Sequence, residues 1–255
     1  MPIVHVNNID MYYEIHGEGS PLIYIPGWGT EITTVSVQIA DFARKFRVIA
    51  IDKRGTGRTD KPEELYSIEQ MADDTIGIMD AAGIARAHIL GISMGSMVAQ
   101  EIAAKYPDRV NGLVLHVGFT RIPFVIKTLM NLMLYLPGSK KKMEEGMATI
   151  LGQKYPPTHE SFRRQGEAVA QFDGRKVIGK IRAPTLIVNC SKDQFVPMKI
   201  TRELANGIPG AKLVLVDGDH SISWTNPELL LTQVAGFLEA VDVRDSGTCI
   251  KTKIW

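Results

Sequence analysis

Cysteine is scarce in this sequence: only two of its 255 residues are cysteines, at positions 190 and 249. Two isolated cysteines match no metal-ligand spacing and provide no disulfide framework, and Cys190, just past an apolar run, is predicted to belong to the core. Long apolar runs are also missing, since none approaches the roughly 18 residues that span a bilayer. The first residues, Met1 to His5, show no basic region followed by an apolar stretch. We therefore expect no membrane segment and a cytoplasmic location.

An excess of charge of one sign is lacking too, because 29 basic and 28 acidic residues leave a net charge of +1. We expect no nucleic-acid partner. The charges are nevertheless unevenly placed, since residues 119–182 hold twelve basic and five acidic residues and the remainder is acidic. This basic segment either steers an anionic substrate or an acidic carrier protein or, as is usual for a run such as Lys140-Lys141-Lys142, is solvated surface.

Hydrophobic residues make up 45% of the chain, which is enough for one sizeable core. Two alternating runs, 3–6 and 11–15, are joined by Asn7-Asn8 and predict an antiparallel hairpin. After residue 21, strand-like runs alternate with segments of helical periodicity, which predicts a mostly parallel, twisted sheet with helices on both faces. The strand-like runs are 22–25, 47–51, 87–90, 110–117, 185–188 and 213–216, and the helical segments are 32–42, 68–82, 94–105, 198–206 and 227–241.

The alternation stops between about residues 119 and 180, where the sequence is rich in Met, basic and mostly helical. We interpret this segment as an insertion into one α/β domain. The predicted organisation is a core of residues 1–118 and 181–243, a helical insertion of residues 119–180, and a loose tail of residues 244–255. A chain of this kind is expected to be a monomer or a homodimer.

The motif Gly91-Ile92-Ser93-Met94-Gly95 stands between a strand-like and a helix-like run. A sharp strand-to-helix turn projects a serine hydroxyl outward, and glycines two residues to either side remove side chains that would collide there. The motif therefore predicts that Ser93 is a nucleophile.

A nucleophilic serine needs a base, and the base needs an acid that orients it. His220 follows the last predicted strand in a Gly-Asp turn, whereas the other five histidines lack this position; they are His5, His16, His88, His116 and His159. Asp193 follows the preceding strand, while Asp217 and Asp219 are too close in sequence to His220 to reach its far nitrogen. We predict a triad in the chain order Ser93, Asp193, His220.

Acyl transfer also requires donors aimed at the developing oxyanion. The backbone N–H of Met94, directly after the nucleophile, is one candidate. The other is the N–H of Trp28 in the loop Pro26-Gly27-Trp28-Gly29, which follows a predicted strand and is rich in glycine. The alternative is that these glycines only make a turn. The Trp28 indole is also a candidate wall of the substrate pocket.

The segment from Asp52 to Asp60, Asp-Lys-Arg-Gly-Thr-Gly-Arg-Thr-Asp, clusters glycines and a lysine after a strand. It lacks both the spacing of a phosphate-binding loop and that of a dinucleotide-binding loop. We interpret it as a turn held beside the site by Asp and Arg side chains. No metal and no organic cofactor is expected.

These motifs, in this order and spacing, resemble those of α/β-hydrolases over nearly the whole chain. The resemblance is greatest to the small group of carboxylesterases, enol-lactonases, perhydrolases and carbon–carbon bond hydrolases. The Gly-Trp-Gly loop is similar to that of pimeloyl-acyl-carrier-protein methyl ester esterases. Two residues depart from the family's usual pattern: Pro26 replaces a frequent histidine of the oxyanion loop, and Cys190 replaces a frequent glycine before the acid. Neither departure removes a catalytic group, so they bear on the subfamily and not on the chemistry.

The resemblance implies that residues 119–180 form a helical cap over the site and set the substrate. Apolar cap residues are then candidates to line an acyl pocket or simply to pack the cap onto the body; they are Phe124, Leu129, Met130, Met133, Leu134, Met143 and Met147. The expected activity is hydrolysis of carboxylic esters through an acyl-enzyme. Enol-lactone or carbon–carbon bond hydrolysis with the same triad is an alternative, and a ligand receptor on the same fold is another.

Overall fold

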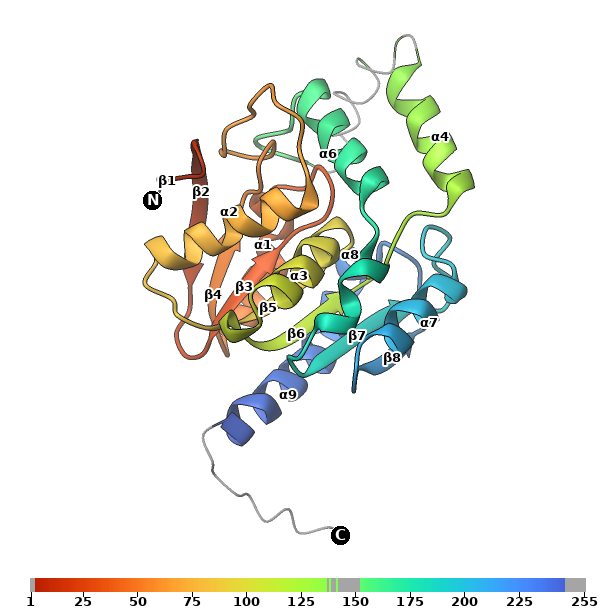
Figure 1. Ribbon diagram of the computed structural model, residues 1–255. Helices are drawn as coiled ribbons and strands as arrows, with labels where there is room; N and C mark the ends of the chain where they lie inside the picture. The colour runs from red at the N-terminus through yellow and green to blue at the C-terminus, as the bar shows by residue number, and fades with distance from the viewer. Residues whose placement is uncertain (1–2, 137, 139–140, 142–151, 246–255) are drawn as a thin grey trace.

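The computed structural model describes residues 3–136, 138, 141 and 152–245. Its centre is an eight-stranded sheet in the order β1-β2-β4-β3-β5-β6-β7-β8 (Figure 1). The strands are β1 (Ile3–Val6), β2 (Ile9–His16), β3 (Pro21–Ile25), β4 (Arg47–Ile51), β5 (Ala87–Ile92), β6 (Val110–His116), β7 (Thr185–Cys190) and β8 (Lys212–Val216). The fold is the predicted one, a mostly parallel sheet that begins with an antiparallel hairpin.

The hairpin of β1 and β2 turns at Asn7 and Asn8, whose φ angles are 48° and 63°. Two consecutive residues with positive φ are typical of a tight hairpin turn whose twist matches the strands, and Asn tolerates this region better than most residues. β2 also pairs antiparallel with β4, and every later neighbour in the sheet is parallel.

Strands β3 to β7 are buried on both faces, which explains why they read as continuous apolar runs. Alternate side chains face opposite layers: Ile23 and Ile25 belong to one core cluster, and Leu22 and Tyr24 to the other. Cys190 ends β7 and is 2% exposed, which confirms that it belongs to the core.

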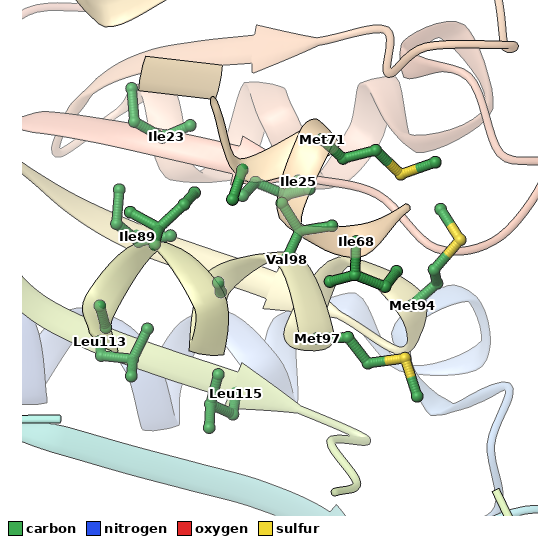
Figure 2. Packing of buried hydrophobic residues seen from close by; sticks show 14 of the residues in the cluster. Ile23, Ile25, Ile68, Met71, Ile89, Met94, Met97, Val98, Leu113 and Leu115 are labelled. Carbon is green, nitrogen blue, oxygen red and sulfur yellow. The ribbon is translucent and has the colours of Figure 1, made fainter. Parts of the chain in front are cut away.

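Helices cover both faces of the sheet (Figure 1). The cluster around Ile23 receives α2 (Ile68–Ala81), α3 (Met94–Lys105) and α7 (Met198–Gly207). Figure 2 shows Met94, Met97 and Val98 of α3 packed between the sheet and α2. The opposite cluster receives α1 (Ser36–Ala43), α8 (Ile222–Thr225) and α9 (Pro227–Asp245).

In the described part of the chain between β6 and β7 lie two longer helices, α4 (Phe124–Tyr135) and α6 (His159–Gln171). Two short 3₁₀ turns, Gly174–Lys176 and Ile178–Lys180, then lead into β7. α4 and α6 lie beyond the end of the sheet at which the β6 chain leaves it (Figure 1). The division into core, cap and tail stays a prediction, and we refer to residues 119–180 as the cap segment.

Several predicted boundaries differ from those of the structure. The helix expected over residues 32–42 begins instead as a 3₁₀ turn, Ile32–Val35, and continues as α1. The helix predicted over residues 227–241 continues to Asp245, so residues 244 and 245 belong to α9; Cys249 lies outside the described residues. Within the described part of the chain, no helix is both long and apolar enough to cross a membrane.

Candidate active site

Ser93 stands at the sharp turn between β5 and α3, with φ 54° and ψ −117°. Its neighbours confirm why glycine is needed two residues away. A β-carbon on Gly91 would lie 2.2 Å from the carbonyl oxygen of Gly95, and a β-carbon on Gly95 would lie 2.1 Å from that of Ile25. The Ser93 N–H donates to the carbonyl of His116 at 2.9 Å, which fixes the turn to β6. The motif thus forms the strained turn that the sequence predicts.

A hydrogen-bonded chain joins the three residues of the predicted triad. Oγ of Ser93 lies 2.9 Å from Nε2 of His220, and Nδ1 of His220 lies 2.7 Å from Oδ2 of Asp193. A carboxylate only accepts, so Nδ1–H donates to Asp193 and leaves Nε2 as the acceptor for the Ser93 hydroxyl. The Asp193 side chain is 1% exposed, whereas that of His220 is 22% exposed. The three residues, which follow the order Ser93, Asp193, His220 along the chain, are therefore joined in space in the order Ser93, His220, Asp193.

Asp193 is held in place by its own loop. Its Oδ1 accepts the N–H groups of Phe195 at 2.8 Å and Val196 at 2.9 Å, while Oδ2 is left to His220. The alternative carboxylates have other partners: exposed Asp217 pairs with Lys192, and Asp219 accepts the N–H and hydroxyl of Ser221. The structure therefore brings Asp193, and neither alternative, to His220.

The predicted oxyanion loop lies against the elbow. A β-carbon on Gly27 would lie 3.5 Å from that of Ser93, so the backbone of this loop passes within contact of the nucleophile. Among the described residues, neither the Trp28 N–H nor the Met94 N–H has a hydrogen-bond partner. Met94 is the first residue of α3, where the helix leaves its N–H groups unpaired. Both groups are free to meet a ligand oxygen, and their role stays a prediction.

The cap residues proposed to line the substrate pocket divide into two sets. Met130 and Leu134 are buried and form a small cluster with Phe162, against which Trp28 packs. Phe124 and Leu129 are 81% and 60% exposed, so their side chains face away from that cluster. Of the remaining candidates, the side chain of Met133 lies outside the described part of the chain, as do Met143 and Met147.

A cavity of about 370 Å³ lies beside His220. Its walls include Phe195 and Trp224, which are 64% and 41% exposed, and Phe195 meets the His220 ring edge-on with centroids 5.3 Å apart. These two aromatics are not among the site residues predicted from the sequence. Their positions in the sequence could have indicated them, because Phe195 lies two residues after Asp193 and Trp224 lies four residues after His220.

The turn after β4 contains the expected network of Asp and Arg. Arg54 and Asp74 form a two-point ion pair at 2.9 and 3.0 Å, and both side chains are 1% exposed. Asp52 accepts the N–H of Ile32 and of Arg58. Burial lowers the pKa of Lys53, in the same turn, to about 7. The network holds the turn together, as the sequence indicates.

The buried histidine His116 ends β6, and its backbone carbonyl accepts the Ser93 N–H. His116 is 1% exposed, and its ring nitrogens contact the Val188 carbonyl at 2.9 Å and the Ser223 hydroxyl at 2.8 Å. Burial lowers its pKa to about 4, with a smaller contribution from the positive charge of His220. As for metals, no group of three or more His, Cys, Asp or Glu that could hold an ion occurs in the part of the chain that the structure describes.

The amino-acid sequence matches those of known proteins. The family model described as alpha/beta hydrolase fold matches residues 20–143. The curated protein "Putative carbamate hydrolase RutD" of Azorhizobium caulinodans is 31% identical over 95% of this chain and 100% of its own length.

Solved structures of hydrolases have the same fold. The enol-lactonase of Burkholderia xenovorans superposes with a TM-score of 0.81 at 27% identity, covering 93% of this chain and 100% of its own. Est816, an N-acyl homoserine lactone degrading enzyme, superposes with a TM-score of 0.76 at 28% identity, covering 92% and 100%. The chain therefore belongs to the α/β-hydrolase fold family, and its relatives are hydrolases of the small esterase and lactonase type.

Proposed function

We propose that this protein is a serine hydrolase that cleaves carboxylic esters through an acyl-enzyme. The observation that carries the proposal is the continuous hydrogen-bonded chain from the Ser93 hydroxyl through His220 to buried Asp193. Such a chain activates a hydroxyl that is otherwise a weak nucleophile at neutral pH. In this proposal no metal and no organic cofactor takes part.

In the first half of the reaction, Nε2 of His220 takes the Ser93 proton as Oγ attacks the ester carbonyl carbon. The carbonyl oxygen becomes an oxyanion, which the N–H groups of Trp28 and Met94 stabilise. The tetrahedral intermediate then collapses, and His220 returns its proton to the leaving alcohol. Asp193 keeps the imidazole in the correct tautomer and stabilises its positive charge.

In the second half, a water molecule attacks the acyl carbonyl and His220 takes its proton. The second tetrahedral intermediate expels Ser93 Oγ, which regains a proton from His220, and the carboxylic acid leaves. The two donors stabilise the oxyanion in both halves, so that each half gains from the same fixed geometry.

The site's walls favour an apolar acyl group. Met130, Leu134 and Phe162 form an apolar cluster beside Trp28, and the adjoining loop supplies the proposed oxyanion donor. Apolar pockets with a few polar groups are the usual form of small-molecule sites. We propose that the cap segment provides this apolar wall.

Lactone hydrolysis is the second candidate. A lactone is a cyclic ester, so the same steps apply, except that the leaving alcohol stays attached to the acyl group. Two structural relatives are named for lactone substrates, an enol-lactonase and an N-acyl homoserine lactone degrading enzyme. A carbon–carbon bond hydrolase or a ligand receptor on this fold has no comparable observation in its favour.

The test is hydrolysis of p-nitrophenyl esters of graded acyl length beside N-acyl homoserine lactones and enol lactones, with the products identified. Ser93→Ala is expected to abolish turnover of every substrate that the wild type cleaves. Ser96→Ala is the matched control, because this buried hydroxyl lies one helical turn away and has no hydrogen-bond partner among the described residues. Unchanged turnover in Ser93→Ala would refute the proposal.

A further inference from the structure

Four hydrogen bonds fasten the loop after β3 to the cap segment. The Gly29 N–H donates to Oε1 of Gln165 at 2.9 Å, and the Gly29 carbonyl accepts from Nε2 of Gln153 at 2.9 Å. The Trp28 indole donates to the Phe162 carbonyl at 2.8 Å. A further bond runs from the N–H of Tyr155 to Oε1 of Glu31 at 2.8 Å. The loop that supplies the Trp28 N–H is therefore bonded to the cap segment at Trp28, Gly29 and Glu31.

Gln165 is the centre of this arrangement. Its side chain is fully buried on α6 and uses both ends of its amide: Oε1 accepts from Gly29, and Nε2 donates to the Arg54 carbonyl at 2.6 Å. Arg54 is itself fixed by its buried ion pair with Asp74. Gln165 thus connects the loop after β3 to the rigid turn after β4. The neutral amide supplies the acceptor at one end of the side chain and the donor at the other.

The contacts of this loop determine which way its peptide groups face. The Gly27 carbonyl accepts from the Thr30 N–H at 3.3 Å, and the Trp28 carbonyl accepts from the Thr30 hydroxyl at 3.3 Å. In a trans peptide the N–H points opposite to the carbonyl. Because the Gly27 carbonyl faces Thr30 inside the loop, the Trp28 N–H faces the other side. Gln165 holds the next peptide, Trp28–Gly29, by its N–H.

The aromatic ring of Trp28 is fixed by the same helix. It stacks on Phe162 with ring centroids 4.3 Å apart and planes 15° apart. Gly166, the neighbour of Gln165, makes room for it, because a β-carbon there would lie 2.6 Å from Cζ2 of Trp28. α6 therefore constrains both the side chain and the backbone of the residue that carries the proposed donor.

We propose that Gln165 is a positioning residue for the oxyanion hole, and that the cap segment is part of the catalytic machinery as well as a wall of the substrate pocket. This inference rests on the proposed function. Oxyanion donors act because they are oriented before the charge develops. Without Gln165, the Trp28–Gly29 peptide loses its bond to α6 and is held only by the longer bond from the Thr30 hydroxyl to its carbonyl. The substrate still binds, but the Trp28 N–H no longer stays aimed at the oxyanion.

The test compares Gln165→Met, which keeps the length of the side chain and removes both polar ends, with Gln165→Asn, which keeps the amide but is one methylene too short to bridge. Gln171→Met, at the exposed end of the same helix, is the matched control. Titration of Ser93 with a fluorophosphonate counts the folded sites in each preparation. Values of kcat per site and KM are then measured with p-nitrophenyl acetate.

Removing one oxyanion donor lowers kcat by about 10²–10³-fold, so misaiming one is expected to lower kcat per site roughly 10- to 100-fold. KM should stay within about twofold, because the lost interaction is made only in the transition state. A trifluoromethyl ketone, which forms an oxyanion adduct with Ser93, should bind weaker by the same factor as the loss in kcat/KM. Gln171→Met should match the wild type in all three measurements.

The inference is overturned if both Gln165 variants keep kcat per site within twofold of the wild type. It is also overturned if the loss appears only in KM, or if kcat falls while the affinity for the trifluoromethyl ketone is unchanged. Failure of the proposed function looks different: Ser93→Ala would then keep its activity, and the ketone would not inhibit even the wild type.

Discussion

The carbonyl oxygen of Ile25, at the end of β3, approaches Gly95 so closely that a β-carbon on Gly95 would lie only 2.1 Å from it. Helix α3 therefore begins in direct contact with the neighbouring strand, and only glycine fits. We predict that Gly95→Ala destabilises the protein by several kcal/mol, on the order of 3 or more, because backbone atoms must move apart. Urea unfolding followed by circular dichroism measures the change.

Gly236→Ala in α9 is the control for this prediction. A β-carbon there would meet nothing within 4 Å, so the change should stabilise the helix by up to about 1 kcal/mol. If the two substitutions cost the same, the close approach at Gly95 is not what requires glycine.

Asp193→Asn should leave the fold intact and lower kcat by about 10⁴-fold, because the amide no longer holds His220 in the required tautomer. Asp217→Asn is the matched control: this residue is nearby, but its exposed side chain bonds to Lys192 and Ser191 instead. It should keep the wild-type rate with p-nitrophenyl acetate. An equal loss in both variants would assign the effect to the loops rather than to the orientation of His220.

The sequence was enough to predict the strands and the meeting of Ser93, His220 and Asp193, because both depend on local pattern. A buried parallel strand must be apolar throughout, and the turn at Ser93 requires small neighbours on both sides. His220 and Asp193 follow successive strands of a parallel sheet, so they emerge at the same edge as Ser93. Hence their order along the chain predicts that they meet.

The bonds from Gln165 and Gln153 to Gly29 could not be predicted in this way. They join residues more than 120 positions apart along the chain, and a glutamine on a helix reads as a polar surface residue until its neighbours are known. The order of the strands and the split of the helix over 32–42 are likewise decided by packing, which leaves no periodic signal. The aromatics Phe195 and Trp224 stand in loops, where periodicity has no meaning.

The neighbouring residues Asp73 and Asp74 on α2 should differ sharply in their contribution to stability. Asp74→Ala leaves the Arg54 guanidinium buried and unpaired, which costs about 3–5 kcal/mol. Asp73→Ala breaks a pair with Lys105 in which both side chains are about one-third exposed, and such pairs contribute about 0–1 kcal/mol. Urea unfolding of the two variants measures the difference directly, and equal costs would contradict the ranking by burial.

His116 should make the fold sensitive to mild acid. Its pKa is lowered to about 4 in the folded protein from an ordinary value of about 6.5, so the unfolded chain binds more protons between these values. The free energy of unfolding therefore falls as the pH drops from about 6.5 toward 4, and His116 adds nothing to this dependence above about 6.5. At pH 5 the loss attributable to His116 is roughly 2 kcal/mol.

The measurement is urea unfolding of the wild type and of His116→Gln at pH 7 and pH 5. Glutamine offers a donor and an acceptor toward the Val188 carbonyl and the Ser223 hydroxyl, which His116 contacts, but it does not titrate. The variant is expected to be less stable than the wild type at pH 7 because its packing changes, yet to lose about 2 kcal/mol less on going to pH 5. Histidines at the surface titrate alike in both proteins and cancel in the difference. Parallel losses in the two proteins would show that another group carries the acid sensitivity.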